Sequence, residues 1–186
     1  MEVVQLHHRA VDGFGRRVAA VSEEQWDQNT ELPGWDVRTL VNHLVNESKW
    51  TAPLLDGSRI EDIGDRFDGD LLGNDPKTAW DESAAEAKAA VNEESLDRTV
   101  HLSVGDAPGR EYVMQLFADY LIHSWDLARA VNGDDNLEPD LVEACAQWFS
   151  SVEDDYRSAG AIGEAPEIPQ EADPQTKLLA RFGRMA

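Results

Sequence analysis

The stretch ADYLIHSWDLARA, residues 118–130, combines the apolar pattern of a buried helix with polar side chains in one register. Asp119 and His123 are four residues apart, so on a helix they stand on the same face, one turn from each other. Asp126 follows about one turn later. A helix expected to bury Tyr120 and Trp125 therefore also carries the carboxylate of Asp119 beside an imidazole. Polar side chains in such a helix need hydrogen-bond or ligand partners.

Helical periodicity extends outward from this stretch in both directions. Apolar residues at helical spacing predict long helices over about residues 2–21, 36–57, 75–94 and 110–131. A further helix is expected after Pro139, and a short one within residues 174–184. Ser22 and Gln25 have the spacing of a capping box. We therefore expect an all-α fold, a four-helix bundle with long connections.

The connections between these helices have their own signals. Residues 57–74 are acidic and glycine-rich, which predicts a surface loop. Residues 99–104 alternate and favour an extended segment, and residues 105–109 have the composition of a turn, so one short strand or hairpin is expected. We expect residues 1–186 to form a single helical domain, with residues 160–186 as a loop and a short C-terminal helix packed on it.

Composition excludes several classes of partner. The formal charge is -21 and the isoelectric point is about 4.4, which disfavours nucleic acid and anionic membrane surfaces. No apolar run is long enough to cross a membrane, and no secretion signal is expected. With the single cysteine Cys145 no intramolecular disulfide forms, so a cytoplasmic location is expected. Solubility alone is the simpler explanation of the charge.

The polar residues of the helices have the composition of a metal site. Asp119 and His123 can supply two ligands from one helix, and His43, in the middle of another amphipathic helix, can supply a third. Such ligands suit Zn²⁺, with Ni²⁺, Fe²⁺ or Co²⁺ as alternatives, and three protein ligands leave a coordination position open. From spacing alone, an ordinary helical ion pair and a partly buried, hydrogen-bonded His43 are the simpler explanation of the pattern.

Two motifs resemble a known family. PGWDVRTLVNHLVNE (residues 33–47) followed by DYLIHSWDLARAVNG (residues 119–133) is similar to the DinB-like superfamily, and more narrowly to the mycothiol-dependent maleylpyruvate isomerase family through its N-terminal metal-binding domain. The closing LLARFGR (residues 178–184) resembles the end of the short members of that family. The similarity extends over most of the chain, and the second motif is the more specific of the two.

The resemblance implies a function and a site. It implies a four-helix bundle that holds a divalent metal, usually zinc, through His43, Asp119 and His123. It implies a thiol cosubstrate such as mycothiol and a small electrophile, with S-transfer or thiol-assisted isomerisation as the outcome. The characterised isomerase has glutamate at the position of Asp119, and this chain lacks room for its additional C-terminal domain. The resemblance also allows a homodimer. For the function, the alternatives are a non-catalytic metal- or ligand-binding helical module and metal-assisted hydrolysis.

The remaining polar residues are interpreted individually. Asp126 is expected either to orient a ligand imidazole from its second ring nitrogen or to pair with Arg129. Glu47 is expected to be a solvated residue, with a general base as the alternative. Cys145 lies on an apolar helical face and is expected to be buried and inert. Structural or surface roles are expected for His7, His8 and His101. Core positions are expected for most of the tryptophans, with one or two of them lining a pocket: Trp26, Trp35, Trp50, Trp80, Trp125 and Trp148.

Overall fold

The computed structural model describes residues 1–103 and 105–186. They form two compact units, Met1–Asp135 and Asn136–Ala186, each described here by itself. The elements of the first unit are α1 (Val3–Ala20), η1 (Glu23–Gln25), α2 (Val37–Leu55), α3 (Ile60–Ile63), α4 (Pro76–Ala90), α5 (Glu93–Leu96), β1 (Thr99–Leu102), β2 (Gly105–Pro108) and α6 (Gly109–Ala130). Those of the second unit are α7 (Pro139–Phe149), α8 (Glu153–Ser158) and α9 (Pro174–Arg181).

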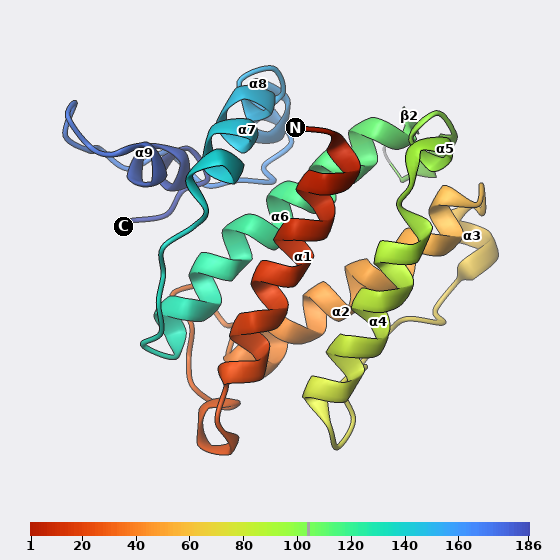
Figure 1. Cartoon of the computed structure of the whole chain (residues 1–186), viewed down its shortest axis with the longest axis horizontal. Helices are drawn as coiled ribbons and strands as arrows, with labels where there is room; N and C mark the ends of the chain where they lie inside the picture. Colours follow the sequence, from red (N-terminus) through yellow and green to blue (C-terminus); the bar gives the residue numbers. More distant parts are fainter. Residues whose placement is uncertain (104) are drawn as a thin grey trace. The chain divides into compact units, whose positions relative to one another are not determined.

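The first unit is a bundle of the four long helices α1, α2, α4 and α6 (Figure 1). Helix α1 packs most extensively on α6 and also on α4, while α2 packs on α4 and α6. The four helices therefore close a ring in which α1 and α2 are diagonal. Most of α6 is buried, because it packs against α1 and α2 and also contacts α5 and the hairpin. The fold class expected from the helical periodicity, all-α with a four-helix bundle, is confirmed.

Local sequence signals place most helix ends correctly. The Asp36 carboxylate accepts a hydrogen bond from Thr39 N at 2.7 Å and so caps the start of α2. Asp75 caps α4 in the same way and is followed by Pro76 at the first helical position. Ser22 and Gln25 form the expected capping box. Helix α2 continues through Pro53 in its last turn and ends at Leu55, close to the end predicted near residue 57.

The segment between α2 and α4 was expected to be only a surface loop, and this is wrong in part. It contains the short helix α3, and Ile63 and Leu72 are buried. Asn42 and Asn46 on α2 donate hydrogen bonds to carbonyl groups of this segment, those of Gly69 and Phe67. These side chains replace water as partners of the loop backbone, so the segment is fixed to α2 although its own sequence lacks periodicity.

The hairpin is real, but its turn lies earlier than expected. Strands β1 and β2 pair antiparallel, with Leu102 opposite Gly105 and Thr99 opposite Pro108. Residues 105–109, expected as the turn, therefore supply the second strand and the start of α6. Gly105 has a φ of 125°, a left-handed conformation that glycine adopts without strain. Val104, which ended the expected extended segment, lies outside the described residues.

The second unit is small and is built on aromatic packing. Phe149 stacks on Phe182 with ring centroids 4.0 Å apart, and α7 packs on α9. Glu153 receives hydrogen bonds from both Arg157 and Arg181. The helix expected after Pro139 ends at Phe149, and Glu153–Ser158 form the separate helix α8. In the described parts of both units, the helices are too short or too polar to span a bilayer.

Candidate metal centre

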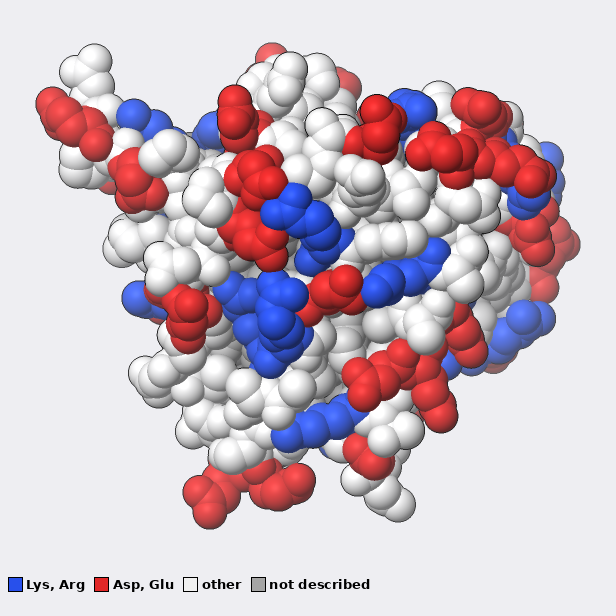
Figure 2. All heavy atoms as spheres, in the orientation of Figure 1, with Lys and Arg blue, Asp and Glu red and all other residues white. Residues whose placement is uncertain are grey.

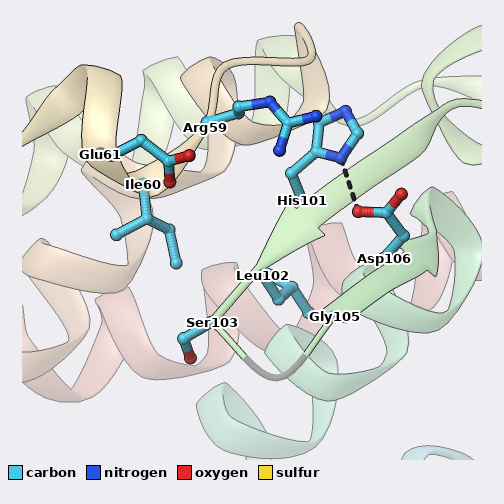
Figure 3. Close-up of a pocket in the computed structure, with 8 residues that line it drawn as sticks. All are labelled: Arg59, Ile60, Glu61, His101, Leu102, Ser103, Gly105 and Asp106. Carbon is cyan, nitrogen blue, oxygen red and sulfur yellow. Dashed lines mark hydrogen bonds and ion pairs between the residues drawn. The ribbon is translucent and has the colours of Figure 1, made fainter.

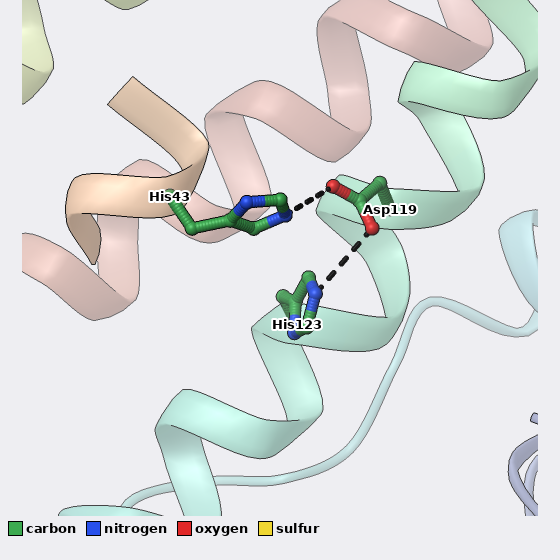
Figure 4. Close-up of side chains that lie close together, drawn as sticks. All are labelled: His43, Asp119 and His123. Atoms are coloured by element: carbon green, nitrogen blue, oxygen red, sulfur yellow. Dashed lines mark hydrogen bonds and ion pairs between the residues drawn. The ribbon is translucent and has the colours of Figure 1, made fainter. Parts of the chain in front are cut away.

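Helices α2 and α6 bring together the three residues that the sequence proposed as ligands (Figure 4). Nε2 of His43 lies 3.0 Å from Oδ2 of Asp119, and Nε2 of His123 lies 3.4 Å from Oδ1 of the same carboxylate. One ligand atom from each residue lies within 4.8 Å of the others. The two imidazoles face one carboxylate from two different helices, which is the arrangement of a site for a single divalent cation.

The cluster is reachable from solvent on one side. The side chains of His43 and Asp119 are 29% and 36% exposed, whereas that of His123 is 9% exposed. A small molecule can therefore approach between His43 and Asp119, while His123 forms the inner wall. This partial exposure is typical of a site that exchanges ligands rather than of a closed structural site.

The charges of the cluster favour a cation. Burial opposes ionisation of Asp119, but the charge of His123 and hydrogen bonds from both imidazoles hold its pKa well below the usual range. Burial also opposes protonation of His123, yet Asp119 and Asp126 raise the pKa of its imidazole to about 9. The carboxylates thus stabilise positive charge at the position where a metal ion would bind.

Asp126 fixes the orientation of His123. Its Oδ2 accepts a hydrogen bond from Nδ1 of His123 at 2.8 Å, and Asp126 is itself buried. This leaves Nε2 of His123 facing Asp119. Arg129, the other partner that the sequence allowed, forms ion pairs with Glu31 and Asp135. The geometry is that of a carboxylate that orients a ligand histidine and makes it more basic.

Trp35 lies beside both imidazoles. Its ring centroid is 5.1 Å from that of His43 and 6.0 Å from that of His123, and it stacks on His123 at 19°. The turn that carries it is held by hydrogen bonds of Thr30 to the Trp35 carbonyl and by Gly34 with a φ of 79°. The sequence predicted that one or two of the tryptophans line a pocket but did not single out Trp35; its place within the PGWD motif was the available signal.

Glu47 corrects an expectation. The sequence favoured a solvated side chain, but the residue is half-buried and lies one helical turn after His43 on α2. Burial, followed by the negative charge of Asp119, raises the pKa of its carboxyl to about 7. The nearby imidazoles lower it but do not outweigh these effects. The inner side of the site therefore contains a second carboxyl group.

The other candidate residues lie outside this cluster. His7 is fully buried in α1, and His8 makes a hydrogen-bond contact with the Lys88 carbonyl at 3.0 Å. His101 forms an ion pair with Asp106 across the hairpin, at one side of a surface pocket of about 480 Å³ (Figure 3). Cys145 is buried, as expected, and burial raises the pKa of its thiol to about 12.

The fold and the cluster together define a helical bundle with a candidate His–Asp–His cation site. The family model described as the mycothiol maleylpyruvate isomerase N-terminal domain matches residues 7–128, and the chain belongs to this family. That matched range contains all three residues of the cluster. The resemblance seen in the two sequence motifs is thereby confirmed.

Comparisons with individual proteins agree with this assignment. The uncharacterized proteins MT0763 and Rv0738 of Mycobacterium tuberculosis (strains CDC 1551 / Oshkosh and ATCC 25618 / H37Rv) are each 30% identical to the chain over 190 residues, covering 99% of it and 98% of their own lengths. The crystal structure of the mycothiol-dependent maleylpyruvate isomerase superposes with a TM-score of 0.63 at 16% identity. That match covers 88% of this chain and 72% of the isomerase, and it shows a shared fold.

Proposed function

We propose that this protein is a metal-dependent enzyme that uses a low-molecular-weight thiol of the mycothiol type for S-transfer to, or thiol-assisted isomerisation of, a small electrophile. The observation that carries the proposal is the convergence of His43, Asp119 and His123 from α2 and α6 in one partly exposed cluster. Membership of the mycothiol maleylpyruvate isomerase family supports the choice of thiol chemistry.

The residues present fit a divalent cation. Two imidazoles and one carboxylate form a borderline donor set that suits Zn²⁺, with Ni²⁺, Fe²⁺ and Co²⁺ as alternatives. The shorter Asp119 side chain reaches both histidines, as the distances of 3.0 and 3.4 Å show, so it can take the position of the family glutamate. A cation held there would act as a Lewis acid that lowers the pKa of a thiol bound at its open position.

The protein's own residues prepare the site for that chemistry. Asp126 holds His123 through Nδ1, so its Nε2 remains available to the cation. Trp35 packs against both candidate ligand rings and gives one side of the site an apolar surface. The open side between His43 and Asp119 admits the small molecules.

The proposal includes the expected partners and location. Acidic side chains are spread over the face shown in Figure 2, interspersed with lysines and arginines, in keeping with a small-molecule enzyme rather than a nucleic-acid-binding protein. We place the protein in the cytoplasm, where low-molecular-weight thiols are kept reduced.

The test begins with metal content. Protein purified without chelator or metal-affinity resin is analysed for bound metals, beside His43→Ala, His123→Ala and, as a matched control, His101→Ala. We expect about one metal per chain in the wild type and in the control, because His101 is paired with Asp106 in the hairpin. We expect loss of the metal in the other two variants.

A second step separates thiol chemistry from its alternatives. Replacement of the bound metal by Co²⁺ provides an absorption spectrum, and mycothiol is added to look for a sulfur-to-cobalt charge-transfer band. Appearance of this band, followed by turnover of a broad panel of electrophiles, supports the proposal. A stable metal with neither thiol binding nor turnover would assign the chain to a non-catalytic binding module. Hydrolysis without thiol would assign it to metal-activated water chemistry.

A further inference from the structure

Beside the three-residue cluster, the bundle interior holds two polar groups that are left without hydrogen-bond partners. The hydroxyl of Tyr112 is buried near the Thr51 hydroxyl, and none of the described residues makes a hydrogen bond of normal geometry with it. The Glu47 carboxyl interacts through charge with Asp119, His43 and His123, and none of the described residues donates a hydrogen bond to it. Buried hydroxyl groups are normally paired, so the Tyr112 hydroxyl requires an explanation, and the half-buried Glu47 carboxyl is free to accept a hydrogen bond.

Helical register places both groups next to the cluster. Glu47 follows His43 by one turn on α2, and Tyr112 precedes Asp119 by two turns on α6. Helices α2 and α6 pack on each other. The charge of Glu47 acts on the Tyr112 phenol as well as on the cluster, which places the carboxyl within electrostatic range of both.

The neighbouring hydroxyl groups are already engaged. Thr51 donates its hydroxyl to the backbone carbonyl of Glu47 at 2.8 Å. Tyr120 and Ser48 share a hydrogen bond of 2.8 Å. Ser48 and Thr51 thus donate their hydroxyl protons to backbone carbonyls, so neither donates a hydrogen bond to the Glu47 carboxyl or the Tyr112 hydroxyl. In the described chain the charges that act on Glu47 come from one carboxylate and two imidazoles, with no lysine or arginine among them.

We propose that Glu47 and Tyr112 form a polar subsite beside the metal cluster, which binds a hydrogen-bond donor or cationic end group of the small molecule that enters the site. The inference rests on the proposed function and names its substrate class: a hydroxyl, amide or ammonium group is accepted, and an added carboxylate is disfavoured. A donor would pair with both the Glu47 carboxyl and the Tyr112 hydroxyl, whereas an anion would meet the negative charges of Glu47 and Asp119.

The test uses three thiols of equal length that differ only in their end group: cysteamine, 2-mercaptoethanol and 3-mercaptopropionate. Affinity for the Co²⁺-loaded protein is read from the sulfur-to-cobalt absorption band, so no turnover is required. Wild type is compared with Glu47→Gln, Tyr112→Phe and, as a control, Glu82→Gln at an exposed position of α4. Because the thiols differ in their own acidity, each is compared between variant and wild type.

The expected pattern is specific. Glu47→Gln weakens cysteamine binding about tenfold, as expected for loss of a charge-assisted hydrogen bond, and leaves 3-mercaptopropionate unchanged or tighter. Tyr112→Phe weakens 2-mercaptoethanol roughly threefold to tenfold, the range for one neutral hydrogen bond. Metal content stays at the wild-type level in both. Equal shifts for all three thiols, or no shift, would overturn the subsite.

A second arm asks which molecule carries the donor group. With the thiol at saturation, maleamide and maleate are compared as a neutral and an anionic electrophile in wild type and Glu47→Gln. A change in the thiol series assigns the donor to the thiol, and a change only in the electrophile pair assigns it to the electrophile. If the wild type holds no metal, the proposed function fails. The three thiols are then titrated calorimetrically into metal-free wild type and Glu47→Gln. If Glu47→Gln does not weaken cysteamine binding relative to 3-mercaptopropionate, the subsite is overturned as well.

Discussion

His7 gives the sharpest prediction about stability. It is fully buried in α1, and neither ring nitrogen has a hydrogen-bond partner among the described residues. Its ring makes an edge contact with Tyr120, at a centroid distance of 5.6 Å. Burial, followed by the charges of His8 and Lys88, lowers the pKa of His7 to about 3.

The sign and size of the effect follow from proton linkage. The folded protein keeps His7 neutral, while the unfolded chain protonates it near its ordinary pKa of 6.5. Below that pH the unfolded state binds a proton that the folded state refuses, so stability falls as pH falls from 6.5 towards 3. Each pKa unit corresponds to about 1.4 kcal/mol, so by about pH 5 the loss is roughly 2 kcal/mol.

The assay compares His7→Leu with wild type. Urea unfolding is measured at about pH 7.5 and about pH 5 with chelator present, so that metal binding does not contribute. Leucine has no titrating ring. The free energy of unfolding of His7→Leu, relative to that of wild type, should therefore rise by roughly 2 kcal/mol between the higher and the lower pH. A His101→Leu variant controls for the loss of an imidazole elsewhere. Parallel pH curves for His7→Leu and wild type would refute the reasoning.

Three further predictions concern the site, a helix contact and the cysteine. Asp126→Asn weakens metal binding by about 10- to 100-fold, measured by competition with a chromophoric chelator, because it loses the carboxylate that orients His123; unchanged affinity would contradict this role. Gly15→Ala lowers the free energy of urea unfolding by about 1–3 kcal/mol, because the added Cβ would lie 2.9 Å from Nε1 of Trp80. The control Gly13→Ala is neutral or stabilising, since its Cβ would have no contact below 3.7 Å. Cys145 does not react with a thiol reagent in the native state and reacts once unfolded, because it is buried and the pKa of its thiol is about 12; rapid native labelling would be inconsistent with the packing.

Much of the fold and the three candidate ligands could be predicted from the sequence, because the signals are local. Side chains four residues apart on a helix share a face, so Asp119 and His123 are adjacent wherever the helix packs. Caps such as Asp36 and Asp75 fix helix starts through hydrogen bonds within three residues. His43 lies 76 residues before Asp119; its place in the middle of an amphipathic helix made it a candidate, and the family motifs supported that choice.

Only the tertiary structure decided how distant segments meet. The turn of the hairpin was misplaced because glycine and proline in residues 105–109 mark turns by composition, while strand pairing places them in a strand. The burial of Glu47 and of His7 depends on which helix covers them, which periodicity on a single helix does not specify. The local sequence therefore determined the helices and the shared face of Asp119 and His123, whereas packing between α2 and α6 determined that His43 meets these two candidate ligands.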